Sequence, residues 1–176
     1  PLLVRLAGEG VNFEGFQLAG IDLECRRLPG APLVHANLEG ARLFKTELDG
    51  AHLYGANLKG ATLFKASLAG ANLRAAHLSG ANLLGANLKG TRLEGADLGR
   101  GHVLANEHQG DQLARTDRGE ALKHWHAAEE IYLALLNNFR EAGRNDEAGE
   151  IFYRLMVSKR KIMRRDTVGR WGAWCM

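Results

Sequence analysis

Two segments, Ala56-Asn57-Leu58-Lys59-Gly60 and Ala86-Asn87-Leu88-Lys89-Gly90, are identical and lie thirty residues apart. Cut into windows of five from residue 11 to residue 105, the chain gives 19 windows, and the central residue is Leu in all but two of them. The residue two places before the centre is Ala in 12 windows. A period of five fits neither an α-helix, with about 3.6 residues per turn, nor a β-strand, whose side chains alternate. Self-similarity at a fixed period predicts a solenoid.

These A-N-L-x-G windows resemble the pattern of the pentapeptide repeat family, over somewhat more than half of the chain. The resemblance implies an all-β solenoid, a right-handed, four-sided parallel β-helix with one pentapeptide on each side and four in each coil. Small Ala and medium-sized Leu side chains suit the narrow interior of such a coil, and each buried Leu contributes roughly 1.5 to 3 kcal/mol. Gly ends 12 windows, from Gly15 to Gly95, and this predicts corners where the backbone needs positive φ.

The pattern divides the chain into a pentapeptide-repeat β-helix over residues 1–110, with residues 1–10 as an N-terminal cap, and a C-terminal region over residues 111–176. One irregularity interrupts the array. Arg26 falls at an inward position, and an unpaired cation is costly to bury, so we expect a bulge around residues 26–32.

The C-terminal region has the apolar spacing of two helices. Thr116 or Asp117 is the candidate N-cap of the first helix, Gly143 is its expected stop, and a second helix is expected from about Asp146. The pair is expected to form a helical hairpin with a basic tail. It resembles the hairpin that follows pentapeptide arrays in some prokaryotic membrane proteins, in which a membrane domain comes next.

Outward residues that lie twenty positions apart share one face of a four-sided coil. On one face the residue after the centre of the window is apolar four times, and this predicts a vertical stripe of Phe44, Phe64, Leu84 and Leu104. Contiguous exposed apolar surface marks a contact site. Three interpretations stay open: the C-terminal helices of the chain cover the stripe, a second copy covers it in a homodimer, or an unrelated protein binds there.

No catalytic, cofactor-binding or metal-binding constellation emerges from the sequence, and the chain is not expected to be an enzyme. His52, His77 and His102 are spaced by twenty-five residues and therefore fall on different faces. The glycines recur every five residues and form no phosphate-binding loop.

The charge balance argues against one alternative function, a DNA-mimicking, topoisomerase-binding protein, which the family resemblance also suggests. Mimicry of DNA phosphates requires a strongly acidic rod. Through residue 105 the chain instead has eleven Lys or Arg against nine Asp or Glu. Nor does this balance predict binding of the rod to nucleic acid.

Near the end of the chain lies a cluster of basic and Trp residues, Lys159, Arg160, Lys161, Arg164, Arg165, Trp171 and Trp174. Such clusters occur at helix ends, where cations complement the helix dipole, and also beside anionic lipid. The sequence thus leaves two locations open: the cytoplasm, or the cytoplasmic side of a membrane if the natural chain continues into a membrane domain. Its two cysteines lack any motif spacing, which favours reduced thiols. The preferred interpretation is a non-enzymatic interaction scaffold whose partner is unknown.

Overall fold

The computed structural model describes residue 5, residues 11–99 and residues 104–171, with side chains described up to Met163 except that of Ala105. The chain divides into two compact units, Pro1–Leu104 and Ala105–Met176. The predicted N-terminal cap, residues 1–10, lies outside the described residues apart from Arg5.

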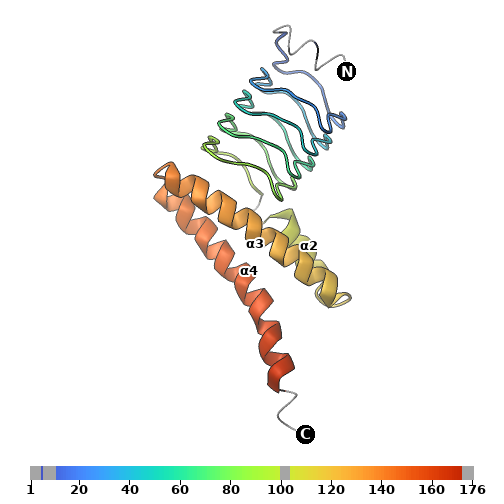
Figure 1. Cartoon of the computed structure of the whole chain (residues 1–176), viewed down its shortest axis with the longest axis vertical. Coiled ribbons are helices and arrows are strands. Elements are labelled where there is room, and N and C mark those ends of the chain that lie inside the picture. The colour runs from blue at the N-terminus through green and yellow to red at the C-terminus, as the bar shows by residue number, and fades with distance from the viewer. Residues whose placement is uncertain (1–4, 6–10, 100–103, 172–176) are drawn as a thin grey trace. The chain divides into compact units, whose positions relative to one another are not determined.

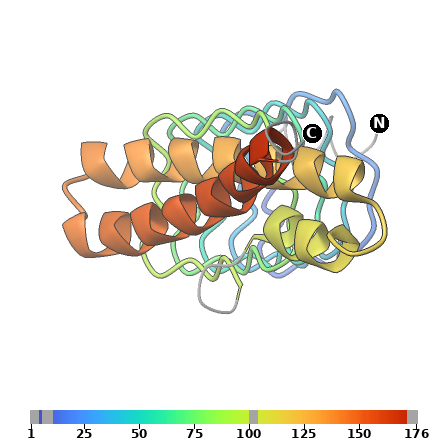
Figure 2. The same cartoon turned by 90° about the horizontal axis from the view of Figure 1, so that it is seen from below.

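The first unit is a stack of coils (Figure 1). Isolated parallel β-bridges join residues twenty positions apart, from Gln17↔Asn37 to His77↔Asp97. Each coil therefore consists of four pentapeptides. Backbone hydrogen bonds link a coil to the coils on both sides of it. Asn57 N–H donates to the Ala36 carbonyl of the preceding coil at 3.0 Å, and Leu58 N–H donates to the His77 carbonyl of the next coil at 2.8 Å. Seen from below, successive coils largely overlap (Figure 2).

Ala and Leu fill the interior of the coils, as the sequence predicts. From the second coil to the fourth, the central Leu residues are buried, and Leu48, Leu53 and Leu58 are 0% exposed. Most of the Ala residues two places earlier are also buried, as at Ala51 and Ala56, whereas Ala86 is half-buried. Because a bridge forms only once on each side, the regular element is a short straight segment and not a long strand.

The last residue of each window forms a corner of the coil. Gly60, for example, has φ +63°, and the preceding Leu58 carbonyl accepts a hydrogen bond from Ala61 N–H at 3.1 Å. A four-residue turn with positive φ at its third residue alone is a type II β-turn. Five corners hold another residue in the same left-handed conformation, and these are Cys25, His35, Lys45, Lys65 and Ala75. The prediction of positive φ at the corners is confirmed.

The bulge predicted around residues 26–32 is wrong. Bridges continue through this stretch, as at Arg27↔Glu47, and Arg26 is exposed. The reason lies in the direction of side chains two places before the centre. At the equivalent position of the second coil the side chain leans toward the preceding coil: Thr46 Oγ1 donates to the Leu23 carbonyl at 2.8 Å. Arg26 belongs to the first described coil, so no described coil lies on the side toward which it leans, and its exposed side chain needs no buried partner.

The second unit contains three described helices, α2 (Ala105–Leu113), α3 (Arg118–Glu141) and α4 (Asn145–Trp171). Helix α3 packs against both α2 and α4. The predicted boundary at residue 110 lies within α2. The segment Ala105–Leu113 has lost the inward Ala and Leu of the repeat, and as a helix it buries Glu107 instead.

Both ends of α3 agree with the sequence prediction. Asp117 is the N-cap, and its side chain accepts a hydrogen bond from Glu120 N–H at 3.0 Å. At the other end Gly143 has φ +71°, and the next residue, Arg144, donates its N–H to the Phe139 carbonyl at 2.8 Å. This pair of features forms a Schellman motif. The Arg144 guanidinium also lies 4.8 Å from the centre of the Phe139 ring, where an apolar contact is usual.

A buried ionic network connects the three helices. Glu107 of α2, 1% exposed, accepts hydrogen bonds from Tyr132 Oη of α3 and Lys161 Nζ of α4, both at 2.6 Å. Lys161 also donates to Asp111 at 2.7 Å, and Trp125 donates to the same carboxylate at 3.1 Å. Burial alone would lower the pKa of Lys161, but its hydrogen bonds to Asp111 and Glu107 outweigh burial and raise that pKa above its usual value.

The corners yield a matched pair of substitutions. Gly55 and Gly60 have nearly the same φ, +62° and +63°, but a Cβ at Gly55 would lie 2.4 Å from His35 Nδ1, whereas nothing lies within 4 Å of one at Gly60. We expect Gly60→Ala to lower the free energy of unfolding by about 1 kcal/mol through left-handed strain. Gly55→Ala should cost about 1 kcal/mol more, because the displaced His35 ring loses its edge contact with Tyr54. Denaturant unfolding measures both values. Equal costs, or no relief when His35 is also changed to Ala, would contradict this account.

The ionic network yields a second prediction. Lys161→Met leaves Glu107 buried without its cation, so we expect a loss of about 3 to 5 kcal/mol in the stability of the helical unit. Adding Glu107→Gln should restore most of that loss. Lys123→Met is the matched control, since Lys123 pairs with Glu120 at the surface and such pairs contribute at most about 1 kcal/mol. Helical circular dichroism during denaturation reports the stabilities.

The raised pKa of Lys161 also predicts a dependence on pH. The stabilisation is present below the ordinary lysine pKa of about 10.4 and is lost as pH rises through the higher folded-state pKa. The melting temperature of the wild-type helical unit should therefore fall above about pH 10.4, and that of Lys161→Met should fall less. The same slope in both proteins would exclude Lys161 as the titrating group.

Candidate interaction surface

The predicted stripe runs along one face of the repeat unit. The rings of Phe44 and Phe64, in successive coils, stack with centroids 5.6 Å apart and an interplanar angle of 26°. Leu84 occupies the same position in the next coil, and all three side chains are half-buried. The stacking follows from the twenty-residue coil, because parallel bridges such as Arg42↔Thr62 hold these coils in register.

Two lysines lie over the aromatic part of this stripe. Lys45 Nζ is 5.2 Å from the centre of the Phe44 ring, and Lys65 Nζ is 5.1 Å from that of Phe64. Each lysine occupies the corner directly after its phenylalanine, with positive φ. Cation–π attraction holds a lysine over its ring, so the face presents apolar surface and positive charge together.

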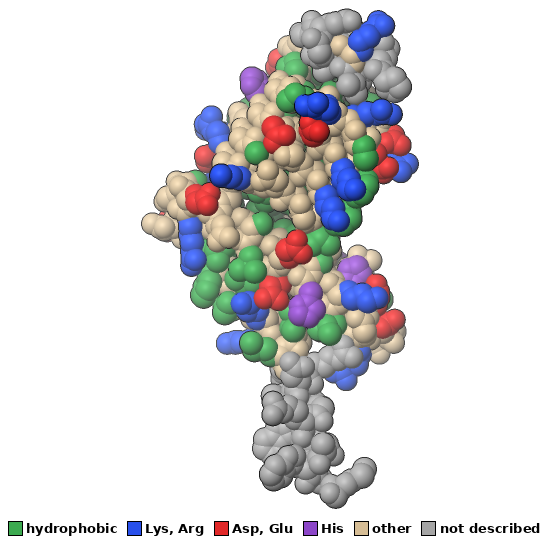
Figure 3. Space-filling view, in the orientation of Figure 1, with side chains coloured by type: hydrophobic (Ala, Val, Ile, Leu, Met, Phe, Trp, Pro, Cys, Tyr) green, Lys and Arg blue, Asp and Glu red, His purple; other side chains and the backbone are tan. Residues whose placement is uncertain are grey.

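The three windows that carry the stripe, residues 41–45, 61–65 and 81–85, contain no Asp or Glu. We call these windows the cationic apolar face. In the space-filling view, cationic side chains lie beside hydrophobic ones at one edge of the repeat unit, and acidic side chains lie elsewhere on the side turned to the viewer (Figure 3). The combination is suited to a partner segment that has both apolar and acidic side chains.

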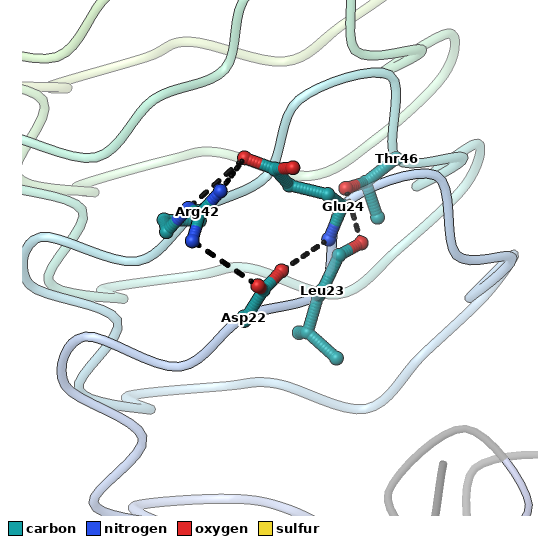
Figure 4. A network of polar contacts seen from close by, with 5 residues as sticks. All are labelled: Asp22, Leu23, Glu24, Arg42 and Thr46. Atoms are coloured by element: carbon teal, nitrogen blue, oxygen red, sulfur yellow. Dashed lines mark hydrogen bonds and ion pairs between the residues drawn. The ribbon is translucent and has the colours of Figure 1, made fainter.

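An ionic cluster bounds this face toward the N-terminus (Figure 4). Arg42 Nη2 lies 2.7 Å from Glu24 Oε1, and Arg42 Nη1 lies 3.3 Å from Asp22 Oδ2. The hydrogen bond to Glu24, with the negative charges of Asp22 and Glu24, raises the pKa of Arg42. The stripe therefore begins at Phe44, one coil beyond the acids.

Leu104, the fourth predicted member of the stripe, differs from the others. It is 3% exposed, so its side chain is not accessible to a partner. It ends the first unit, and helix α2 begins at the next residue. Of the four predicted residues, Phe44, Phe64 and Leu84 thus contribute accessible surface.

The face that carries Val34 and Tyr54 at the same window position does not form a comparable stripe. Tyr54 is 40% exposed and meets His35 edge to face at 5.3 Å. In the following two coils the position holds Arg74 and Glu94, whose side chains pair at 3.6 Å. Charge therefore interrupts this column, as the sequence indicates.

The structure separates the members of the basic cluster near the end of the chain. Lys161 belongs to the internal network with Glu107, Lys159 lies 3.6 Å from Glu129 of α3, and Arg160 is exposed. The remaining predicted members, Arg164, Arg165, Trp171 and Trp174, have side chains outside the described residues. The sequence did not reveal the partners of the two lysines, since Glu107 and Glu129 are remote along the chain.

Two kinds of feature are absent from the described part of the chain. In those residues no group of three or more His, Cys, Asp and Glu side chains is placed to hold a metal ion. Among the same residues, no helix combines the length and apolar character needed to cross a bilayer.

Comparison with known proteins agrees with the repeat geometry. A family model described as pentapeptide repeats matches eight copies, over residues 31–68 and 66–100. A pentapeptide repeat protein (Rfr23) from the cyanobacterium Cyanothece 51142 is 30% identical, with 54% of this chain and 91% of that one aligned and a TM-score of 0.42. The chain belongs to the pentapeptide repeat family.

Other pentapeptide repeat proteins of known structure are also similar to this one. The protein alr5209 from Nostoc PCC 7120 is 35% identical, covering 53% of this chain and 74% of that one, with a TM-score of 0.36. AT2G44920 from the thylakoid lumen of Arabidopsis thaliana is 25% identical, covering 62% and 79%, with a TM-score of 0.28. No curated protein matches the chain. Members of this family fold as right-handed, four-sided β-helices and are generally non-enzymatic structural proteins.

Proposed function

We propose that this pentapeptide repeat protein is a non-enzymatic scaffold that binds another protein through the face carrying Phe44, Phe64 and Leu84. Its β-helix supplies a rigid support. The helices α3 and α4, which follow the β-helix along the chain, form a helical hairpin. The observation that carries the proposal is the stripe itself: stacked, half-exposed aromatic rings, each with a lysine over it.

The stripe is not needed to build the coil. The interior is complete with the inward Ala and Leu, and the same outward position is filled by Glu39 and Lys59 on another face. Aromatic side chains at interfaces contribute much of the binding free energy when a partner removes them from water. The absence of Asp and Glu from the cationic apolar face favours an acidic partner segment.

The same positive charge argues against the alternative of a DNA-mimicking topoisomerase inhibitor, which would need acids in these positions. For location we propose the cytoplasm, because Cys25 has a free and exposed thiol and such thiols suit reducing compartments. The other alternative, a cytoplasmic domain beside a membrane, rests on the basic cluster. Two of its cations, Lys159 and Lys161, already have carboxylate partners, which weakens that alternative.

Phe64→Asp tests the proposal, and Lys59→Asp is its control, since Lys59 takes the equivalent outward position on the neighbouring face. Three readouts cover the three kinds of occupant: the thermal transition of the helical signal, the solution mass by ultracentrifugation, and photo-crosslinking from a reactive amino acid placed at either position in the host cell. We expect at least one readout to change at Phe64 and none at Lys59. Three unchanged readouts would remove the stripe as a contact site.

A further inference from the structure

The cationic apolar face carries its available positive charge on one flank of the stripe. Lys45 and Lys65 follow the two phenylalanines at the corners, and both lysines are exposed. Each lies over the ring of its own phenylalanine, and neither is paired with a carboxylate of the described residues. These two cations can therefore bind carboxylates that another molecule supplies.

The other flank of the stripe has no comparable cation. Its outward residues, two places before the stripe residues, are Arg42, Thr62 and Asn82. Arg42 is already paired with Glu24 and Asp22, and Thr62 and Asn82 are uncharged. A complementary partner thus needs acidic side chains along one edge of its apolar surface and not along both.

The stripe also has a fixed spacing. Phe44, Phe64 and Leu84 belong to successive coils, which follow one another at about 4.8 Å. The two phenylalanine rings are 5.6 Å apart. The three stripe residues therefore span about 10 Å along the stack, with the ionic cluster around Arg42 at one end. A partner that contacts all three residues has to run along the stack.

An α-helix matches this spacing better than an extended strand does. Helix residues three or four positions apart have Cβ atoms about 5 to 6 Å apart, and seven residues span about 10.5 Å. Alternate residues of a strand are about 6.7 Å apart. A strand laid along the stripe would therefore be about 4 Å out of step with the coils at its third side chain.

We propose that the partner binds this face through an amphipathic, acidic α-helix that lies along the stack. Apolar side chains at positions i, i+4 and i+7 of that helix contact the stripe, and acidic side chains along one edge bind Lys45 and Lys65. This inference rests on the proposed function, because it names the kind of partner segment that the same face binds.

A two-fold pair of this face with its own copy does not fit the charges. A two-fold interface brings the same patch of both molecules together. The cationic apolar face contains no Asp or Glu, so the lysines of one copy would meet no acid of this face on the other. Like charges brought together in this way oppose association.

The lysines are ordered before the partner arrives. Cation–π attraction holds each ammonium group over a ring, at 5.2 Å for Lys45 and 5.1 Å for Lys65. Less side-chain entropy is then lost when a carboxylate binds. The carboxylate also meets the ammonium beside apolar surface, where attraction between charges is stronger than in bulk water.

Two stapled helical peptides test this inference by fluorescence anisotropy with the full chain. The acidic peptide carries Leu at i, i+4 and i+7 and Glu along one edge, and the basic peptide has Lys in place of each Glu. We expect the acidic peptide to bind about tenfold or more tightly than the basic one. Its binding should weaken as salt is added, because salt screens exposed charges. Phe64→Asp should weaken its binding too.

Reversal of the two lysine charges separates charge recognition from general apolar contact. Lys45→Glu combined with Lys65→Glu should reverse the preference, so that the basic peptide binds more tightly than the acidic one. Lys59→Glu is the matched control, since Lys59 is exposed on the neighbouring face. This control should leave the preference for the acidic peptide unchanged.

Three outcomes would overturn the acidic helix: no binding of either peptide, equal affinity for both, or a preference that the double lysine reversal leaves in place. Photo-crosslinking from position 64 in the host cell judges the proposed function separately. Crosslinks there, together with a failed peptide test, would keep the stripe as a contact site and remove the acidic helix as its partner. If the three readouts of the Phe64→Asp test are unchanged, both proposals are wrong.

Discussion

The hydrogen bonds that join each residue to the one twenty positions later are the constraint on which the repeat unit depends. They allow only coils of four pentapeptides, so an insertion of a single residue would move every later side chain to a different place on the coil. The same register explains why inward Leu stacks on Leu. Each side of a coil is held by a single bridge, so short straight segments take the place of long strands.

This register also turns a linear sequence into columns on the outside. Phe44 and Phe64 are twenty residues apart and become stacked rings, and Arg42 meets Asp22 of the preceding coil, which is also twenty residues away. Outward residues contribute little to the interior, so they can carry a contact surface without weakening the fold. A rigid array of columns is well suited to present such a surface, because a partner finds it already ordered and less entropy is lost on binding.

The helical unit is organised differently, around buried charge. Glu107 is almost inaccessible and is stabilised by Tyr132 and Lys161 from two other helices. A buried ion pair adds little net stability compared with an apolar pair, but removal of one partner is costly. The network therefore selects one arrangement of α2, α3 and α4, in which Lys161 belongs to the interior of the unit and Arg160 to its surface.

The sequence by itself determined the coil, its inward Ala and Leu, the corners, the membership of the stripe's first three residues and both ends of α3. These features depend on short-range patterns: a period of five, a left-handed corner, a capping Asp117, a terminating Gly143. Only the tertiary structure decided that Arg26 stays in solvent without a bulge, that Leu104 is buried, that α2 begins at Ala105, and that Lys161 pairs with Glu107. Each of these depends on what lies beside a residue in space, such as a side chain of a helix fifty-four residues away, and a local pattern carries no record of such neighbours.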